Sequence, residues 1–385
     1  MQKTMRLQPD IRAIARMVPP SGNLVQGQNE TAIHPELARA LNEVVAKGLN
    51  HYSFFEGVDE LRQAVAEKVR LYNHVSVNAD NRPLEVMITP GATGGLIIAS
   101  HTYLRQASAV VFEPYYPYHK RTLETCDARV EVVKLRGDRL ELDLDELRRV
   151  CREGKERQQY PLKAIIVSSP ANPTGRVFSR DELMGIIECA QEFDLLLISD
   201  EVYEHFTLDA SDHISTASLP GAFERTITVN SFSKSWAVSG WRLGYLFGPG
   251  ELVSKLALLG NIYYVCTPTP LQHALARVLL ADPQYYDRLR ADFARKRGIL
   301  KAALDRTGFQ VYQSRSSFYI WTRIPERFSD SGEFNDFLMK EAGVAGVPGS
   351  AFMDSPEEDI YMRLCFARED EMLEAAADRI ISALG

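Results

Sequence analysis

Two cationic side chains near position 240 could bind an anionic ligand. Lys234 ends the segment Ser-Phe-Ser-Lys, which directly follows the short apolar run 226–230, and we expect it in a loop just beyond the end of a strand. Arg242 lies a few residues further on between two glycines, which allow close backbone approach while the guanidinium offers a planar donor for phosphate. Because ligands of open α/β sheets bind beyond the carboxyl ends of the strands, we expect both cations to flank one binding site.

Polar residues also follow two other apolar runs. Asp200 comes after the very apolar run 195–199, where a buried carboxylate needs a charged or hydrogen-bonding partner. A protonated pyridine nitrogen would be such a partner, and holding that proton turns the ring into an electron sink. The alternative interpretation is an aspartate that caps the next helix. Asn172, after the run 164–168, could donate to a ring oxygen, with Tyr203 donating from the other side.

A glycine-rich segment, Thr-Pro-Gly-Ala-Thr-Gly-Gly at 89–95, joins the apolar run 86–89 to a helix that we expect to begin near Thr93. Free backbone N–H groups and the helix dipole at such a turn favour phosphate. The segment has neither the GxGxxG pattern nor the terminal Lys-Ser/Thr of a P-loop. It therefore indicates an anion without identifying it.

The elements that would position these residues alternate along the chain. The short apolar runs are 86–89, 109–112, 130–133, 164–168, 195–199, 226–230 and 243–247. Several are continuously apolar, as in strands buried on both faces of a sheet, and helical patterns lie between many of them. The clearest helix follows Ser179, which forms a capping box with Glu182. The pattern predicts an α/β fold with a mainly parallel central sheet and flanking helices.

The chain is long enough for two domains. Its 385 residues exceed the size of about 250–300 at which single cores stop growing. After about residue 280 the pattern changes to a charged amphipathic segment, 285–308, and the runs 309–313 and 318–324, which indicate a smaller α+β unit. We predict an N-terminal segment 1–45 that joins the small domain, a large domain 46–282 and a C-terminal small domain 283–385.

Composition excludes several classes of protein. The formal charge of −7 comes from 44 basic and 51 acidic residues that are interspersed, unlike the basic face of a nucleic-acid binder. The five cysteines are scattered, odd in number and without CxxC spacing, which favours a reducing compartment. No segment reaches the roughly 20 apolar residues of a membrane span, and the N-terminus has no signal-peptide core. We expect a cytoplasmic protein with no metal, membrane or nucleic-acid partner.

Four ordered motifs resemble the class I/II aminotransferases of pyridoxal 5′-phosphate (PLP) fold type I, the aspartate aminotransferase superfamily. They are Asn-Pro-Thr-Gly (172–175), Asp-Glu-Val-Tyr (200–203), Ser-Phe-Ser-Lys (231–234) and Gly-Trp-Arg-Leu-Gly (240–244). The resemblance runs from about Gly27 to Arg363. It implies a PLP-dependent aminotransferase that moves an amino group from an L-amino acid to a 2-oxo acid.

The resemblance also implies residue roles. Lys234 would hold PLP as a Schiff base and move the proton between Cα and C4′, and Asp200 would pair with the pyridine nitrogen. The phosphate ligands would be Gly91, Ala92, Thr93, Ser231 and Arg242; the ring contacts Tyr116, Asn172 and Tyr203; and the substrate contacts Gly27, Asn172 and Arg363. Tyr52 would reach the phosphate of a neighbouring subunit, which implies a homodimer with shared active sites.

Other reactions remain open at this point. The same cofactor cage serves C–S β-lyases, decarboxylases, cyclases and oxidative deaminases, because the pocket decides which bond breaks. A ligand-binding sensor would carry an additional N-terminal basic domain, for which we expect no room before Gly27. The sequence departs from the family at 27–29, at Gly94 and at Ser317, which puts the substrate in doubt but removes no cofactor ligand.

Overall fold

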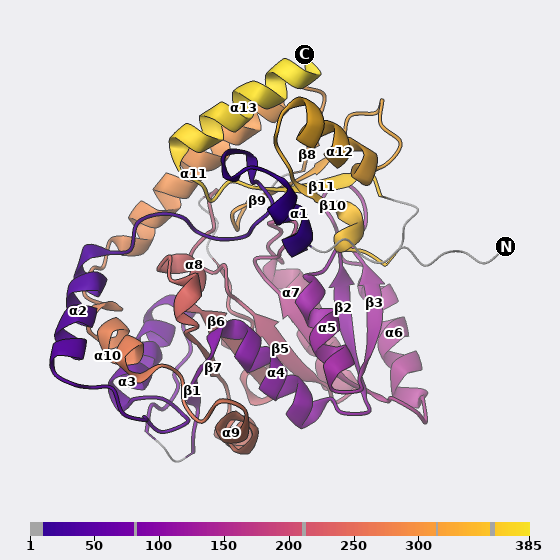
Figure 1. The fold of residues 1–385 in the computed structure, drawn as a ribbon. Coiled ribbons are helices and arrows are strands. Elements are labelled where there is room, and N and C mark those ends of the chain that lie inside the picture. Colours follow the sequence, from indigo (N-terminus) through magenta and orange to yellow (C-terminus); the bar gives the residue numbers. More distant parts are fainter. Residues whose placement is uncertain (1–10, 81–82, 210–212, 313–314, 355–358) are drawn as a thin grey trace.

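The computed structural model describes residues 11–80, 83–209, 213–312, 315–354 and 359–385 (Figure 1). The seven short apolar runs between residues 86 and 247 each form a strand of one seven-stranded sheet. Its strands are β1 (Val86–Thr89), β2 (Ser108–Glu113), β3 (Arg129–Lys134), β4 (Leu162–Ser168), β5 (Leu196–Asp200), β6 (Thr226–Ser231) and β7 (Gly244–Phe247). Their order is β1-β7-β6-β5-β4-β2-β3.

The sheet is mainly parallel, as predicted. Neighbouring strands from β3 to β6 run parallel, and only β7 is antiparallel to its neighbours β6 and β1. The carboxyl ends of β4, β5 and β6 therefore meet at one edge. Figure 1 shows this edge turned toward the smaller unit of the molecule. The residues that follow these three strands are thus brought together by topology alone.

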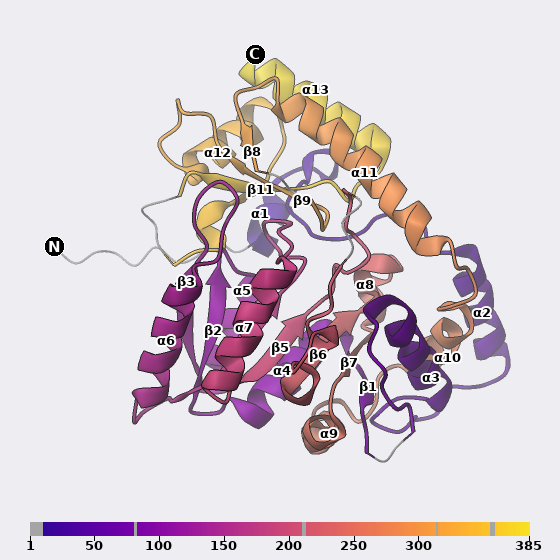
Figure 2. The same ribbon diagram turned by 180° about the vertical axis from the view of Figure 1, so that it is seen from behind.

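Helices cover both faces of this sheet (Figures 1 and 2). One face packs against α4 (Gly91–Tyr103), α5 (Pro117–Thr125) and α9 (Gly250–Tyr264), and the other against α6 (Leu144–Glu156) and α7 (Arg180–Glu192). Successive residues of β4 alternate between the two cores: Ile166 joins the first and Ile165 the second. The predicted capping box of α7 is confirmed, since Ser179 Oγ accepts from Glu182 N and Glu182 accepts from Ser179 N.

A third helical layer covers the β1 end of the sheet. It consists of α2 (Pro35–Ala46), α3 (Asp59–Lys68), the π-helical turn η2 (Val69–Asn73) and α10 (Thr269–Val278). Leu37 and Val44 of α2 pack in the same core as Leu275 of α10. Within the predicted segment 1–45, α2 therefore packs with α10 in the helical layer of the large unit and not with the smaller unit.

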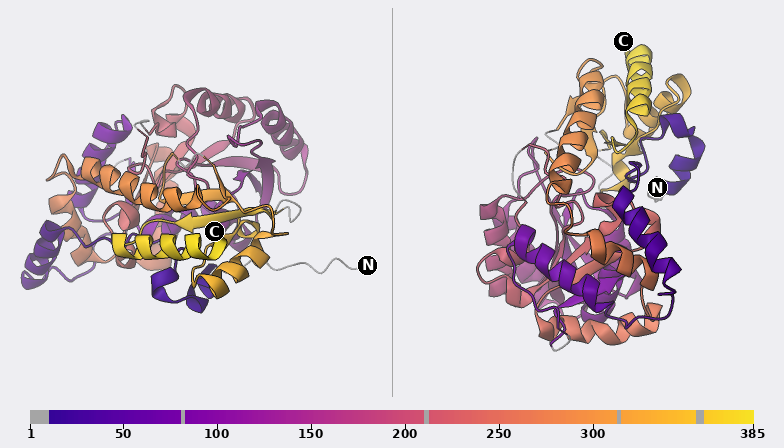
Figure 3. Two further views of the ribbon diagram at one scale, coloured as in Figure 1. Left: turned by 90° about the horizontal axis from the view of Figure 1, so that it is seen from above. Right: turned by 90° about the vertical axis from the view of Figure 1, so that its left-hand side faces the viewer.

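The smaller unit has its own antiparallel sheet, in the order β10-β11-β9-β8. Its elements are α1 (Ile11–Met17), α11 (Tyr285–Leu304), β8 (Gln310–Val311), β9 (Tyr319–Arg323), α12 (Ser331–Glu341), β10 (Val347–Pro348), β11 (Tyr361–Cys365) and α13 (Asp370–Leu384). Figure 3 shows α11 and α13, orange and yellow, alongside each other on this sheet. The predicted run 309–313 forms β8 only in part, and its residue 313 lies outside the described residues.

The chain upstream of α2 crosses from the smaller unit toward the large sheet. Asn23 bridges Ala345, and Leu24 both donates to Ala345 O and accepts from Cys365 N. The residues that follow, up to about 30, lie against the edge where the strands end. Short 3-10 turns complete the fold at Pro20–Gly22, Thr216–Ser218, Phe223–Arg225, Ser239–Trp241 and Gly349–Ala351. In the described part of the chain, no helix is both long and apolar enough to cross a membrane.

Candidate active site

Lys234 lies in a one-turn helix, α8 (Phe232–Ser235), that directly continues β6. We expected a loop here, and that expectation was wrong, because Ser231 caps the turn by accepting from Ser233 N. The ammonium of Lys234 donates to Gly27 O at 2.6 Å. Asn29 Nδ2 in turn donates to Lys234 O at 2.8 Å, so the crossing segment is bound to the lysine at both backbone and side chain.

The surroundings of Lys234 favour its neutral form. Burial lowers the pKa of Lys234 to about 8, and the positive charges of Arg242 and Arg363 act in the same direction. Cys365 and Asp200 oppose the change without cancelling it. A neutral amine is the form that attacks a carbonyl carbon, so this lysine is prepared to hold an aldehyde.

Asp200 ends β5 and is 7% exposed. One carboxylate oxygen lies 2.8 Å from His119 Nε2, and the other accepts weakly from Val202 N at 3.3 Å. No helix begins here among the described residues, so Asp200 is not a helix cap. The carboxylate keeps acceptor capacity for a cationic ring nitrogen. His119 had no role in the sequence-based prediction, although it lies in the first turn of α5, the helix that follows Tyr116.

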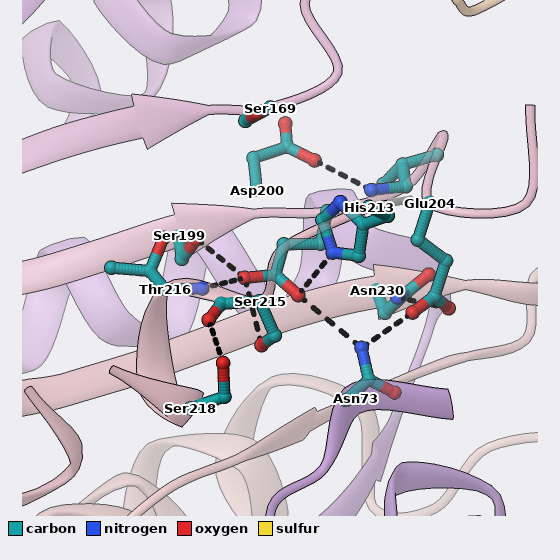
Figure 4. Close-up of polar contacts among 12 residues, drawn as sticks. Asn73, Ser169, Ser199, Asp200, Glu204, His213, Ser215, Thr216, Ser218 and Asn230 are labelled. Carbon is teal, nitrogen blue, oxygen red and sulfur yellow. Dashed lines mark hydrogen bonds and ion pairs between the residues drawn. The ribbon is translucent and has the colours of Figure 1, made fainter. Parts of the chain in front are cut away.

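Figure 4 shows Asp200 set apart from a second polar group that includes Asn73, Glu204, His213 and Asn230. We call this group, together with Glu201 and Lys68, the buried network. Glu201 accepts from Ser199, Ser215, Thr216 and His213, and the Lys68 ammonium pairs with Glu204. The buried network thus supports the ends of β5 and β6.

The buried network is a cluster of ion pairs, and we assign no metal ion to it. Glu201, Glu204 and His213 offer ligand atoms within 4.8 Å of one another. However, Lys68 already supplies a cation to Glu204. Burial alone would raise the pKa of Glu204, but Lys68, His205 and His213 together outweigh burial and lower the value to about 2. The expectation of no metal stays a prediction.

Arg363, on β11, lies 2% exposed beside Asn172. Its Nη1 donates to Asn172 Oδ1 at 2.8 Å and its Nη2 to Val25 O at 2.6 Å. Because arginine only donates, the oxygen of Asn172 must face it, which leaves the Asn172 Nδ2 group free to donate elsewhere. Among the described residues, Arg363 Nε has no partner. The guanidinium thus retains donors for a carboxylate.

Three tyrosines line the space between Asp200 and Arg363. The Tyr203 hydroxyl lies 3.0 Å from that of Tyr319, and burial raises the pKa of Tyr203 well above its usual value. Tyr116 stacks on Tyr118 with ring centroids 5.0 Å apart, and burial likewise raises its pKa. Tyr203 therefore remains a neutral hydrogen-bond donor at physiological pH.

The phosphate cradle forms at the start of α4, where the first helical N–H groups lack partners within the helix. This helix begins at Gly91 and not near Thr93, because the left-handed conformation of Gly91 (φ 68°) turns the chain directly into it. A Cβ at Gly91 would lie 2.6 Å from Arg242 Nη2, and one at Gly244 would lie 2.8 Å from Ala92 N. The two glycines keep this space open. The cradle, together with Ser231, suits a phosphate group.

Tyr52 does not join these residues within one chain. Its side chain is 85% exposed on the loop before α3. Every other predicted site residue borders the edge where the strands end. Sequence reasoning missed His119, Asn29, Tyr319 and Arg368, whose guanidinium donates to the carbonyls of residues 23, 26 and 28. For Tyr319 the only signal was its place beside the unusual Ser317.

A lysine of lowered pKa, a carboxylate at a strand end and a helix start that suits an anion thus meet at one edge of the sheet. Residues 21–380 match the family model for aminotransferase class I and II. The chain is 35% identical to an aspartate aminotransferase of Pyrococcus abyssi over 89% of this chain and 86% of the relative. It is 36% identical to an aromatic-amino-acid aminotransferase of Thermococcus litoralis, again over 89% and 86%.

A solved structure agrees with these relatives. The Escherichia coli protein YbdL, for which a methionine aminotransferase function was identified, superposes with a TM-score of 0.90 and 27% identity over 99% of this chain and 97% of that protein. This chain therefore belongs to the class I and II aminotransferase family, whose members use PLP. It is a PLP-dependent aminotransferase acting on amino and keto acids.

Proposed function

We propose that this chain moves an amino group between an L-amino acid and a 2-oxo acid, with Lys234 holding PLP and Arg363 holding the substrate carboxylate. The observation that carries the proposal is the convergence of the two cations on one strand-end edge. Gly27 O accepts from Lys234, and Val25 O, two residues away, accepts from Arg363. An α-carboxylate bound at Arg363 would thus lie close to the lysine.

Each side chain around this edge has a separate proposed role. When bound, PLP supplies an electron sink for the electron pair of the bond that breaks at Cα. Lys234 Nζ, uncharged in part at neutral pH, would accept and return the proton. Asp200 would hold a proton on the ring nitrogen, and His119 lies where it keeps the Asp200 carboxylate in place. Asn172 and Tyr203 would donate to the phenolic oxygen, and Tyr116 would cover the ring.

The phosphate is assigned to the cradle of α4. Backbone N–H groups of Gly91, Ala92 and Thr93, the Ser231 hydroxyl and the Arg242 guanidinium would surround it. Arg242 donates to the carbonyls of Ser239 and Pro90. Both bonds are exposed to solvent, so Arg242 can turn toward a phosphate without losing buried contacts.

A second copy of the chain is the proposed partner. Large apolar side chains stay exposed on two neighbouring segments: Tyr52, Phe54, Leu258, Ile262, Tyr263 and Val265. The segments adjoin because Phe55 packs in the same core as Leu259 and Tyr264. Apolar patches of this kind mark interfaces. In a homodimer, Tyr52 would reach the phosphate cradle of the partner.

The division of the chain and its location are also proposals. The cores support a large unit built on the seven-stranded sheet and a small unit from about residue 283. The packing of α2 on α10 favours ending the N-terminal segment of the small unit near residue 30, ahead of the predicted boundary at 45. Five unpaired cysteines, four of them buried, support a cytoplasmic location.

A single-turnover reaction tests the proposal. We would mix the PLP-loaded enzyme with a panel of amino acids, without any keto acid, and follow conversion of the aldehyde form to the amine form. Stoichiometric conversion with release of one keto acid is the expected result. Release of ammonia and pyruvate, or of carbon dioxide, would instead indicate one of the other reactions of this cofactor. Lys234→Ala should abolish the visible band while far-UV circular dichroism stays unchanged.

A further inference from the structure

Tyr319, the first residue of β9, touches three parts of the proposed site. Its hydroxyl lies 3.0 Å from the Tyr203 hydroxyl. The Arg363 guanidinium carbon lies 4.2 Å from the centre of its ring. A Cβ added at Gly27 would lie 1.8 Å from the same hydroxyl. Tyr319 is 2% exposed, so these contacts are held in a packed interior.

The direction of the hydrogen bond between the two tyrosines follows if the Tyr203 hydroxyl donates to a second partner. Each hydroxyl has one hydrogen to donate. If Tyr203 donates to the phenolic oxygen of PLP, the hydrogen between the two tyrosines must come from Tyr319. Accepting that bond polarises the Tyr203 O–H group and strengthens its donation, as in other hydrogen-bond chains. Among the described contacts, no other hydrogen bond fixes the orientation of the Tyr203 O–H group.

The ring of Tyr319 acts on the other side. The guanidinium of Arg363 contacts this ring and also that of Phe352, whose centre is 4.9 Å away. Its two terminal nitrogens donate to Asn172 and Val25. Ring contact and hydrogen bonds together fix both the position and the plane of the guanidinium. A carboxylate bound in a two-pronged fashion requires that plane to be fixed.

We infer that Tyr319 is a positioning residue, whose hydroxyl keeps Tyr203 directed at the phenolic oxygen of PLP and whose ring orients Arg363 for the substrate carboxylate. This inference rests on the roles proposed above for Tyr203 and Arg363. It assigns separate tasks to the hydroxyl and the ring, so two substitutions at one position can separate them. Tyr319→Phe removes only the hydroxyl, whereas Tyr319→Leu removes the ring as well.

The first test is a pH titration of the visible band of the lysine-bound cofactor. A weaker hydrogen-bond donor at the phenolic oxygen makes that oxygen more basic. The nitrogen that joins Lys234 to the cofactor then holds its proton more tightly. Tyr319→Phe should raise the pKa of the band by about 0.3–0.7 pH units, and Tyr203→Phe by more. The Kd of the apoenzyme for PLP should rise about five-fold or less in Tyr319→Phe.

A matched control exists in the same sheet. The Tyr312 hydroxyl donates to the Tyr361 hydroxyl at 3.3 Å, and Tyr312 contacts none of the proposed site residues in the described structure. Tyr312→Phe removes one hydroxyl of an equivalent pair and should leave the band unchanged. If Tyr203→Phe moves the band but Tyr319→Phe behaves like Tyr312→Phe, the role of the Tyr319 hydroxyl is overturned. If Tyr203→Phe also leaves the band unchanged, the proposed role of Tyr203 fails, and the inference fails with it.

The second test measures the Kd of propionate, a carboxylate without an amino group, from its effect on the same band. Tyr319→Leu should weaken propionate about five-fold, and Tyr319→Phe should not, since its ring remains. Arg363→Met serves as the reference for complete loss. A Tyr319→Leu protein that melts within a degree or two of wild type yet binds propionate as wild type does would overturn the orienting role of the ring.

Discussion

The state of Lys234 makes a prediction that pH can test. An ordinary lysine has a pKa of 10.5, whereas burial and two neighbouring arginines lower that of Lys234 to about 8. At pH 7.5, a pKa of about 8 leaves roughly one lysine in four uncharged, compared with about one in a thousand for an ordinary lysine. The reactive fraction is therefore about 200-fold larger. Above pH 8 this advantage shrinks, because Lys234 is then mostly neutral.

The assay is the rate at which PLP binds covalently to the apoenzyme, followed by the growth of the visible band between pH 6 and 10.5. We expect the rate constant to rise about ten-fold per pH unit below pH 7.5 and to level off above about pH 8.5. Nα-acetyl-lysine amide with the same PLP is the control, and its rate should rise until about pH 10. A protein rate that still climbs ten-fold between pH 8.5 and 9.5 would refute the assignment of a lowered pKa.

The sign of the effect on stability follows from the same pKa. Between pH 8 and 10.5 the unfolded chain binds a proton at this lysine that the folded apoenzyme has released. The contribution of Lys234 to the free energy of unfolding therefore increases as pH rises through this window. Lys234→Met should remove this dependence, which urea unfolding of the apoenzyme at pH 8 and pH 10 would measure.

Three further predictions concern the surroundings of the site. Lys68→Ala should lower the free energy of unfolding in urea by about 3–5 kcal/mol, because it leaves the buried Glu204 carboxylate unpaired. Arg70→Ala, which removes a neighbouring exposed ion pair with Glu67, is the control and should cost less than about 1 kcal/mol. The pKa of Glu204 is lowered from 4.5 to about 2, so the contribution of the pair to stability is complete above pH 4.5 and is lost as pH falls toward 2. The urea midpoint of the wild-type protein should therefore fall over this pH range, and that of Lys68→Ala should not. Arg363→Met should raise KM for the true amino donor about 10–150-fold, and an unchanged KM would mean that another group holds the carboxylate.

The elements of the large sheet could be predicted because each is specified locally. Strand β1 matches its apolar run at both ends, and the start of α7 follows from the Ser179–Glu182 capping box. Two local predictions were wrong because a single turn set each boundary. Helix α4 begins at Gly91, since the positive φ of Gly91 turns the chain into the helix. Lys234 lies in a helical turn, since Ser231 caps that turn.

The sequence by itself determined the cofactor chemistry of this protein. Asp200 ends a strand, Lys234 and Asn172 each follow one, and the carboxyl ends of parallel strands must meet at one edge. Only the tertiary structure decided which side chains support them. His119, Tyr319 and the Lys68–Glu204 pair act through contacts between segments far apart in the chain, and such contacts depend on packing and leave no periodic or local pattern in the sequence.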